Sequence, residues 1–293
     1  MTCKYILVTP AKNEEKNIEN LIKSVDSQDL KPSLWVIVDD NSDDRTPFLL
    51  KKYSEGKDYI RIVKFPVKKG WDIGIHYSEV CIFGFESAIR IAKKEHIDYE
   101  YIGLLDADII LENNYFIKLI KKMESDKKIG IIGGAVYSWN GNKYILEHNR
   151  EDLPTGAARL WRKEAFEKTN GYMQTYSPDT VSNIKVKIHG WKTYTLKEAK
   201  AYQTRLTSSA MGSWKGLMKV GMSVYYLFYP PEAVLGRVIR LSLTRGVSGA
   251  IAFLLGYFKA WVNRYPRIDD EEIKEYFRNK HKDMINYYLK RAV

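Results

Sequence analysis

Three short apolar segments, each followed within six residues by carboxylates, constrain this chain more than any other feature of its sequence. The segments are residues 5–8, 35–38 and 101–105, and the polar stretches behind them are residues 9–15, 39–42 and 106–108. Apolar runs of this length are typical of strands buried in a parallel sheet. Because ligands of such sheets bind at the carboxyl ends of the strands, we expect the acids to meet along one edge. Carboxylates gathered there suit a divalent cation and the hydroxyls of a nucleotide.

Strand and helix patterns alternate along the first 125 residues. Helices are expected from about residue 14, from about residue 45 and over residues 78–94, with a further strand at residues 59–65. Such alternation predicts an α/β fold with a mostly parallel, doubly wound sheet. A glycine-rich strand is expected at 129–136, a strand and short helix within 154–172, and a helix from Pro178. The 293 residues allow one large domain, expected at 1–205, with a helical extension at 206–293.

Composition limits the compartment and the partners. Cys3 and Cys81 are too few for a disulfide framework, and no basic-then-apolar signal segment opens the chain, so a cytoplasmic protein is expected. The net charge of +11 calls for an acidic partner or a well-solvated surface. The excess lysines lie in pairs scattered over helices, without the interleaved aromatic residues of a stacking platform. Nucleic acid is therefore not an expected partner.

The C-terminal part of the chain is helical, basic and apolar. Trp214–Tyr229 is rich in aromatic residues, and Gly246–Val262 is apolar but shorter than the ~20 residues that cross a bilayer. Five arginines flank the second stretch: Arg237, Arg240, Arg245, Arg264 and Arg267. Two interpretations stay open. The helix lies on an acidic membrane surface, on its cytoplasmic face, or it packs on the catalytic domain and leaves its arginines in solvent. A closing helix is expected at Asp269–Arg291.

The acids of the second and third stretches carry the predicted chemistry. Asp106 and Asp108 alternate along an extended segment, so both carboxylates can face one site, where one holds a cation and the other orients sugar hydroxyls. Their alternative is a solvated turn. Asp40 is placed to accept hydrogen bonds from a base or a ribose, while Asp43 and Asp44 are read as helix caps. In the first stretch, from Pro10 to Glu14, backbone amides are expected to face the ligand.

Taken in order, these motifs resemble the family 2 glycosyltransferases, inverting enzymes of the GT-A type. The resemblance covers roughly residues 4–205 and rests on three segments: Pro10-Ala11-Lys12-Asn13-Glu14-Glu15, Val38-Asp39-Asp40-Asn41-Ser42 and Asp106-Ala107-Asp108. It implies that Pro10, Ala11, Lys12, Glu14 and Val38 line the nucleotide pocket. It also implies that Asp40 binds the base or ribose, that Asp106 and Ala107 face the ribose and sugar, and that Asp108, with Asp106, holds Mg²⁺ or Mn²⁺. The family usually has an aromatic residue where this chain has Lys12.

The resemblance also implies a general base near residue 180. Pro178-Asp179 matches the acid that such enzymes place at the head of a helix, and Asp179 is the residue expected to take the proton of the acceptor hydroxyl. Its alternative is an N-cap of that helix. Arg205 is expected to clamp phosphate and Lys69 to approach the donor. Related enzymes carry a His where this chain has Gln203, which leaves the metal to Asp108 and the diphosphate.

The sequence therefore predicts a transferase that takes a sugar from a UDP, GDP or dTDP sugar. The basic, apolar C-terminal part favours a lipid-linked or polysaccharide acceptor. One alternative enzyme is a sugar-1-phosphate nucleotidyltransferase, although residues 10–15 lack the glycines that such enzymes use to grip a triphosphate. An alternative of another class is a catalytically silent module that binds carbohydrate or lipid on the same fold.

Overall fold

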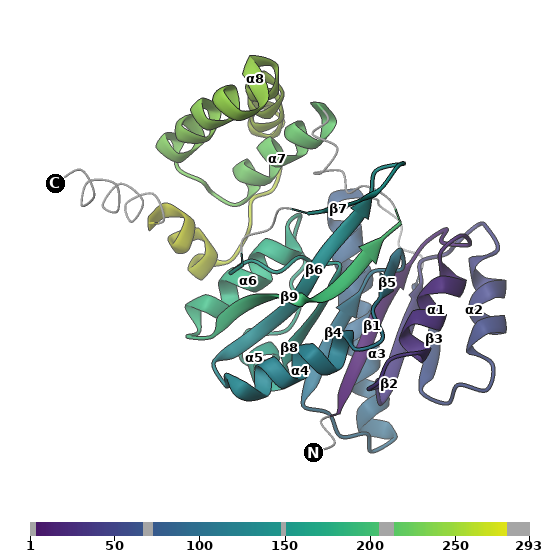
Figure 1. The fold of residues 1–293 in the computed structure, drawn as a ribbon. Helices are drawn as coiled ribbons and strands as arrows, with labels where there is room; N and C mark the ends of the chain where they lie inside the picture. The colour runs from purple at the N-terminus through teal and green to yellow at the C-terminus, as the bar shows by residue number, and fades with distance from the viewer. Residues whose placement is uncertain (1–3, 67–72, 148–150, 205–213, 280–293) are drawn as a thin grey trace. The chain divides into compact units, whose positions relative to one another are not determined.

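The protein is described by a computed structural model that covers residues 4–66, 73–147, 151–204 and 214–279. The chain divides into two compact units, Met1–Leu206 and Thr207–Val293, which are described separately below (Figure 1). The first unit is a mixed α/β structure built on one large sheet, and the second is helical. The predicted fold class, α/β with a helical C-terminal part, is confirmed.

The elements of the first unit follow one another as strand and helix. They are β1 (Tyr5–Ala11), α1 (Ile18–Asp26), β2 (Leu34–Asp39), α2 (Thr46–Ser54), β3 (Ile60–Lys64), α3 (Ile73–Lys94), β4 (Tyr101–Leu105), β5 (Ile109–Leu111), α4 (Tyr115–Ser125), β6 (Ile129–Trp139), β7 (Tyr144–Leu146), β8 (Ala158–Arg162), α5 (Lys163–Lys168), α6 (Pro178–Ile188) and β9 (Lys192–Gln203).

The sheet has a parallel half and a mixed half. Its order is β3-β2-β1-β4-β8-β6-β9-β5, with β7 beside β6. The first four strands are parallel throughout, as their alternation with helices requires. β8 then runs antiparallel to both β4 and β6, and β9 runs parallel to β6. The ends of β1, β2 and β4 that precede the acidic stretches therefore lie at one edge of the sheet.

Helices cover both faces of this sheet because successive strand residues point to opposite sides. Tyr5 and Leu7 of β1 pack into one core layer with side chains of α1 and α4, while Ile6 and Val8 pack into the other with side chains of α3. α3 approaches β1 closely: a Cβ on Gly84 would lie 2.5 Å from Cγ1 of Val8. This contact holds the helix that reaches the acidic edge.

Three helices differ from the predicted boundaries. α1 begins at Ile18, four residues later than expected, and α3 begins at Ile73, before the expected Ser78. In the second unit, α7 spans Trp214–Tyr226 and α8 spans Pro231–Val262, so a further helical segment precedes the apolar stretch expected from Gly246. Gly246 lies inside α8 as a kink with φ 77° and ψ 167°, a conformation that only glycine adopts readily. The closing helix is seen over residues 271–279.

Candidate active site

The first two acidic stretches are tied to each other rather than left open. Asp40 donates its backbone N–H to the carbonyl of Ala11 at 2.8 Å. Three backbone amides of the first loop donate to side chains of the second loop and of the start of α2. The bonds run from Asn13 to Ser42 Oγ, from Glu14 to Thr46 Oγ1 and from Glu15 to Asp44 Oδ2. The amides of Asn13 and Glu14, two of those expected to face a ligand, are therefore engaged within the protein.

The side chains of the strand residues lie mostly in the core. Ala11, Val38 and Ala107 are all nearly fully buried, so only their backbone could reach a ligand. Glu14 is also buried and accepts a hydrogen bond from Asn17 at 2.6 Å. Pro10, the residue before Ala11 on β1, is partly exposed. Asp44, expected as a helix cap, accepts from the amides of both Glu15 and Thr46 and thereby joins the two loops.

Asp40 is a buried carboxylate that two basic side chains approach. Nζ of Lys12 lies 3.3 Å from Oδ2 of Asp40, and Nε2 of His76 lies 2.7 Å from the same oxygen. Lys12 comes from the first loop, whereas His76 comes from the start of α3 and packs edge-on against Phe65. A lone histidine gave no sequence signal, and the expected start of α3 at Ser78 left it outside the helix.

Asp106 is held by Tyr77, the residue that follows His76 in α3. The hydroxyl of Tyr77 donates to Oδ1 of Asp106 at 2.7 Å, and the backbone N–H of Asp106 donates to the carbonyl of Ala157. Burial raises the pKa of Asp106 to about 7, with a further rise from the charge of Asp108 and an opposing effect of the Tyr77 hydrogen bond. His76 and Tyr77 are adjacent residues of α3, so one turn of this helix contacts both Asp40 and Asp106.

Asp108 lies beside the end of β9. Its carboxylate is buried, and Nε2 of Gln203 donates to Oδ2 at 3.1 Å. Gln203 stands where related enzymes carry a histidine, and it places an amide group next to Asp108. The structure contains no cluster of three or more His, Cys, Asp or Glu side chains able to hold a metal among the residues it describes. Asp106 and Asp108 alone offer a pair of carboxylates there.

Asp179 belongs to the same group of charges. It is the second residue of α6, and its carboxylate accepts hydrogen bonds from Arg159 and from the backbone N–H of Gly156, the latter at 3.1 Å. Ser177, not Asp179, is the N-cap residue of α6. The side chain of Asp179 is 46% exposed while that of Arg159 is fully buried. The charge of Asp179 also raises the pKa of Asp106, and that of Arg159 lowers it.

The residue that sequence analysis missed here is Arg159. It projects from β8, stacks over the ring of Trp161 at 4.6 Å and pairs with Asp179. A Cβ on Gly156 would lie within about 2.5 Å of the Asp179 carboxylate, so glycine is required at this contact. Lys69 and Arg205, expected to reach the donor and its phosphates, lie outside the described residues.

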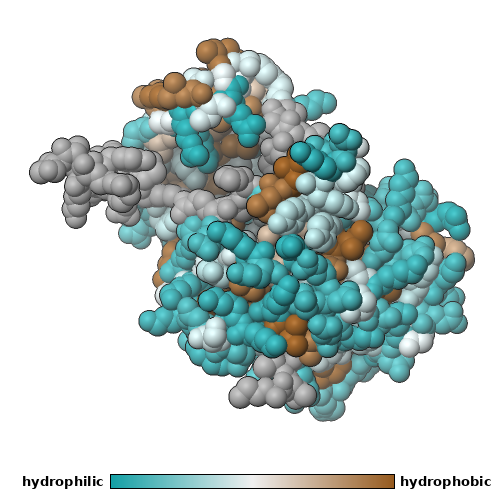
Figure 2. Space-filling model, in the orientation of Figure 1, coloured by the Kyte–Doolittle hydropathy of each residue, from teal (hydrophilic) through white to brown (hydrophobic). Residues whose placement is uncertain are grey.

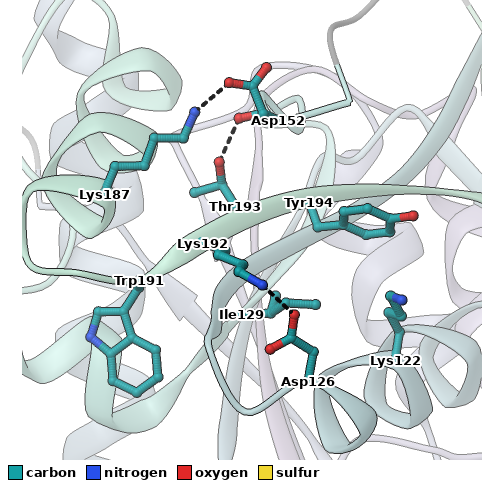
Figure 3. A pocket seen from close by; sticks show the side chains of 9 residues that line it. All are labelled: Lys122, Asp126, Ile129, Asp152, Lys187, Trp191, Lys192, Thr193 and Tyr194. Atoms are coloured by element: carbon teal, nitrogen blue, oxygen red, sulfur yellow. Dashed lines mark hydrogen bonds and ion pairs between the residues drawn. The ribbon is translucent and has the colours of Figure 1, made fainter.

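A groove at the far edge of the sheet is separate from these acids (Figure 3). It has a volume of about 400 Å³ and is lined by Ile129 and by Lys192 at the starts of β6 and β9. Gln203, beside Asp108, ends the twelve-residue β9, which at ~3.3 Å per residue separates the two places by roughly 35 Å. Its lysines pair with neighbouring acids: Lys187 with Asp152 at 2.7 Å and Lys192 with Asp126 at 3.0 Å.

Comparison with solved structures shows the same fold at low sequence identity. The mannosyltransferase PcManGT from Pyrobaculum calidifontis, in complex with GDP-Man and Mn²⁺, matches with a TM-score of 0.57 and 14% identity over 88% of this chain and 75% of its own. S. aureus TarS 1–349 in complex with UDP matches with a TM-score of 0.54 and 13% identity over 75% of this chain. This chain covers 65% of that TarS fragment and 39% of a longer TarS chain.

Sequence comparison identifies the family. No curated protein sequence matches the chain at a significant level. The family model described as "Glycosyl transferase family 2" matches residues 6–182, which is more than half of the 293 residues and contains Asp40, Asp106, Asp108 and Asp179. The chain belongs to glycosyl transferase family 2.

Proposed function

We propose that this protein is an inverting glycosyltransferase that moves a sugar from a nucleoside-diphosphate sugar to a lipid-linked or polysaccharide acceptor. The observation that carries the proposal is the convergence of Asp40, Asp106 and Asp179 through contacts with α3 and β8. Membership of the family supports transfer chemistry. The solved relatives with UDP and with GDP-Man support a nucleotide-sugar donor. We expect the donor to be a UDP, GDP or dTDP sugar.

The nucleoside would lie along the ends of β1 and β2. Asp40 accepts hydrogen bonds from the base or the ribose of the nucleoside. These hydrogen bonds replace the contact of Asp40 with His76 or Lys12. Lys12 is exposed at this edge, where it can reach the nucleotide; Glu14 lies behind it. Pro10, Ala11 and Val38 contribute through their backbone, and Ala107 does the same beside the sugar. Lys69 and Arg205 complete the donor site at the phosphates.

Asp106 and Asp108 have the chemistry of a site for Mg²⁺ or Mn²⁺. Carboxylate oxygens are the ligands that these hard cations prefer. The negative charge of Asp108 contributes to the raised pKa of Asp106, and a bound cation would relieve this repulsion between the two carboxylates. When bound, the cation supplies charge neutralisation for the departing diphosphate. Asp108 is the main ligand in this proposal, and Asp106 shares its charge between the cation and the sugar hydroxyls.

Asp179 acts as the general base. Its carboxylate takes the proton from the acceptor hydroxyl while that oxygen bonds to the anomeric carbon. The bond from the anomeric carbon to the diphosphate oxygen breaks on the opposite face, which gives a β-linked product from an α-linked donor. The proton stays on Asp179, and the nucleoside diphosphate leaves. Arg159 and the Gly156 amide hold the carboxylate in place, while its exposed side leaves room for the acceptor.

We assign catalysis to residues 1–205 and treat residues 206–293 as a helical extension. The extension motivates the choice of a lipid-linked acceptor, since it is basic and exposes apolar side chains. Such a protein would work in the cytoplasm, where it meets nucleotide sugars, at or near the inner face of a membrane.

A thermal-shift screen tests donor and metal together. UDP, GDP, dTDP and CDP are each added with and without Mn²⁺, because a ligand that binds the folded state raises the melting temperature. One nucleotide is expected to give the largest shift, and Mn²⁺ to increase it. The same screen on Asp108→Asn should lose the Mn²⁺ increment. If no nucleotide shifts the parent protein, the donor site proposed here is wrong.

Turnover of Asp179→Asn tests the base. The variant should lose roughly 10²–10⁴-fold in kcat while it keeps the nucleotide-induced thermal shift. Glu164→Gln, an exposed acid on α5, serves as the control and should keep full turnover. Unchanged turnover in Asp179→Asn would remove the proposed base. Nucleotide binding by a parent protein that transfers no sugar would favour a silent binding module, and release of pyrophosphate would indicate a nucleotidyltransferase.

A further inference from the structure

Each half of helix α8 of the second unit, on either side of Gly246, carries a row of exposed apolar side chains. Six of them recur at every fourth position and are between 46% and 83% exposed: Leu235, Ile239, Leu243, Val247, Ile251 and Leu255. At 100° per residue, three such positions span only about 80° of a helix surface. The kink at Gly246 separates two groups of three, so each half of α8 presents one narrow apolar row, called here the apolar face. Figure 2 shows hydrophobic surface on α8 at the top of the view.

In the half of α8 that follows Gly246, the opposite face is already covered by α7. A Cβ on Gly221 would lie 2.0 Å from the carbonyl oxygen of Phe253, and a Cβ on Gly256 would lie 2.0 Å from that of Met218. These glycines bring the two helix backbones into direct contact. Ala252, Phe253 and the neighbouring small residues of α8 are buried on that side. The apolar face is therefore not the surface on which the helical unit builds its own core.

The size of the apolar face is unusual for a soluble surface. Together with Phe258, Trp261 and Val262, which continue it, the face has nine side chains that are about half exposed or more. At roughly 200 Å² for a large side chain, they leave on the order of 1,000 Å² of apolar surface in solvent. Monomeric proteins rarely expose a contiguous patch of more than a few hundred Å². A surface of this kind marks a contact with a partner.

The charges around the apolar face indicate which partner. From Trp214 to Val262 the chain has six basic residues and one acid, Glu232. Arg240, Arg245 and Lys259 are all exposed along α8. Trp214 and Trp261 are also exposed, at 47% and 57%, and tryptophan is enriched where protein meets the lipid headgroups. An apolar row flanked by arginine and lysine is complementary to an anionic lipid leaflet.

The geometry favours a helix that lies on the leaflet over one that crosses it. α8 is long and apolar enough to span a bilayer by length and composition, and only 22% of its apolar window is buried. Its partner α7, however, has 13 residues, or ~20 Å, against the ~30 Å of a hydrocarbon core. Arg237, Arg240 and Arg245 would also have to enter that core, where arginine is costly.

We propose that the apolar face of α8 docks on an anionic membrane surface, with Leu235 to Leu255 in the headgroup–acyl boundary and the flanking basic residues at the headgroups. The two halves of α8 on either side of Gly246 bind together. This surface lies in residues 207–293 and shares no residue with the transfer site. The docking can therefore fail while the glycosyltransferase proposal holds, and the reverse is equally true.

Vesicle flotation of the full chain tests the docking. Phosphatidylcholine vesicles are compared with vesicles in which one third of the lipid is phosphatidylglycerol, at low and at high salt. Binding should occur to the anionic vesicles and weaken with salt, because the headgroup contacts are screened. Arg240→Gln should weaken binding about fivefold, since each basic residue near the surface contributes by that order. Leu243→Glu should reduce binding at least tenfold.

Controls separate this proposal from its rivals. Phe48→Glu replaces a side chain on α2 that is 59% exposed, and it should leave flotation unchanged. Ile239→Glu repeats the test at a second position should Leu243→Glu fold poorly by circular dichroism. Sugar transfer to a soluble acceptor should stay at the parent level in all three variants. The proposal would be overturned if the protein did not float with vesicles or bound neutral vesicles equally well. It would also be overturned by a lipid-free dimer that Leu243→Glu disrupts, because the apolar face would then contact a second copy of the chain.

Discussion

Replacement of Asp106 by asparagine should stabilise the ligand-free protein, and more so at high pH. The pKa of Asp106 is raised from 3.8 to about 7 in the folded protein. The folded state therefore holds a proton that the unfolded state has lost between these values, and the free energy of unfolding falls as the pH rises through this window. At 1.36 kcal/mol per pKa unit, the full cost above pH 7 is about 4 kcal/mol. Between pH 5 and pH 8 the cost grows by about 2 to 3 kcal/mol.

Urea denaturation at 25 °C in EDTA measures this effect. The free energy of unfolding is determined for the parent and for Asp106→Asn at several pH values from 5 to 8. The advantage of the variant should grow by about 2 to 3 kcal/mol over that range. Asp58→Asn, at an exposed position, is the control and should show no such trend. When Mn²⁺ replaces EDTA, the loss of stability with rising pH should become smaller in the parent and stay unchanged in Asp106→Asn. An advantage that is constant from pH 5 to pH 8 would refute the argument that burial and Asp108 strain this carboxyl.

Two further substitutions follow from contacts already described. Tyr77→Phe removes the hydrogen bond that lowers the pKa of Asp106, so the loss of stability in the same pH series should extend to a higher pH. The control Tyr144→Phe, on the exposed β7, should leave the pH dependence of stability unchanged. An unchanged pH dependence in Tyr77→Phe would contradict the contact between Tyr77 and Asp106. Gly221→Ala places a methyl group 2.0 Å from the Phe253 carbonyl and should destabilise the helical unit by about 1–3 kcal/mol. Gly236→Ala on α8, where nothing lies within 4 Å, should instead stabilise it by up to ~1 kcal/mol, as thermal unfolding will show.

The parallel half of the sheet was predictable because its signals are local. Residues 5–8, 35–38 and 101–105 are apolar runs that can only be buried, and a polar stretch containing acids follows each of them. The mixed half was not predictable in the same way. The insertion of β8 between β4 and β6 depends on pairings between segments distant in sequence. No local pattern records which strand lies beside which.

The parts of the site that sequence reasoning missed come from helix starts and buried charges. His76 and Tyr77 precede the first clear helical spacing, so the helix that carries them seemed to begin after them. Arg159 lies in a short strand that also contains Arg162, and its role depends on Asp179, twenty residues away. Each miss concerns a side chain whose partner only tertiary structure supplies.

The adjacency of His76 and Tyr77 gives the two halves of the proposed donor site a common structural element. One residue contacts Asp40 and the other contacts Asp106, and both belong to a single turn of α3. A displacement of that turn by whatever occupies Asp40 alters the environment of Asp106 at the same time. If a nucleoside and a cation bind as proposed, any coupling between them through this turn must change both affinities by the same factor.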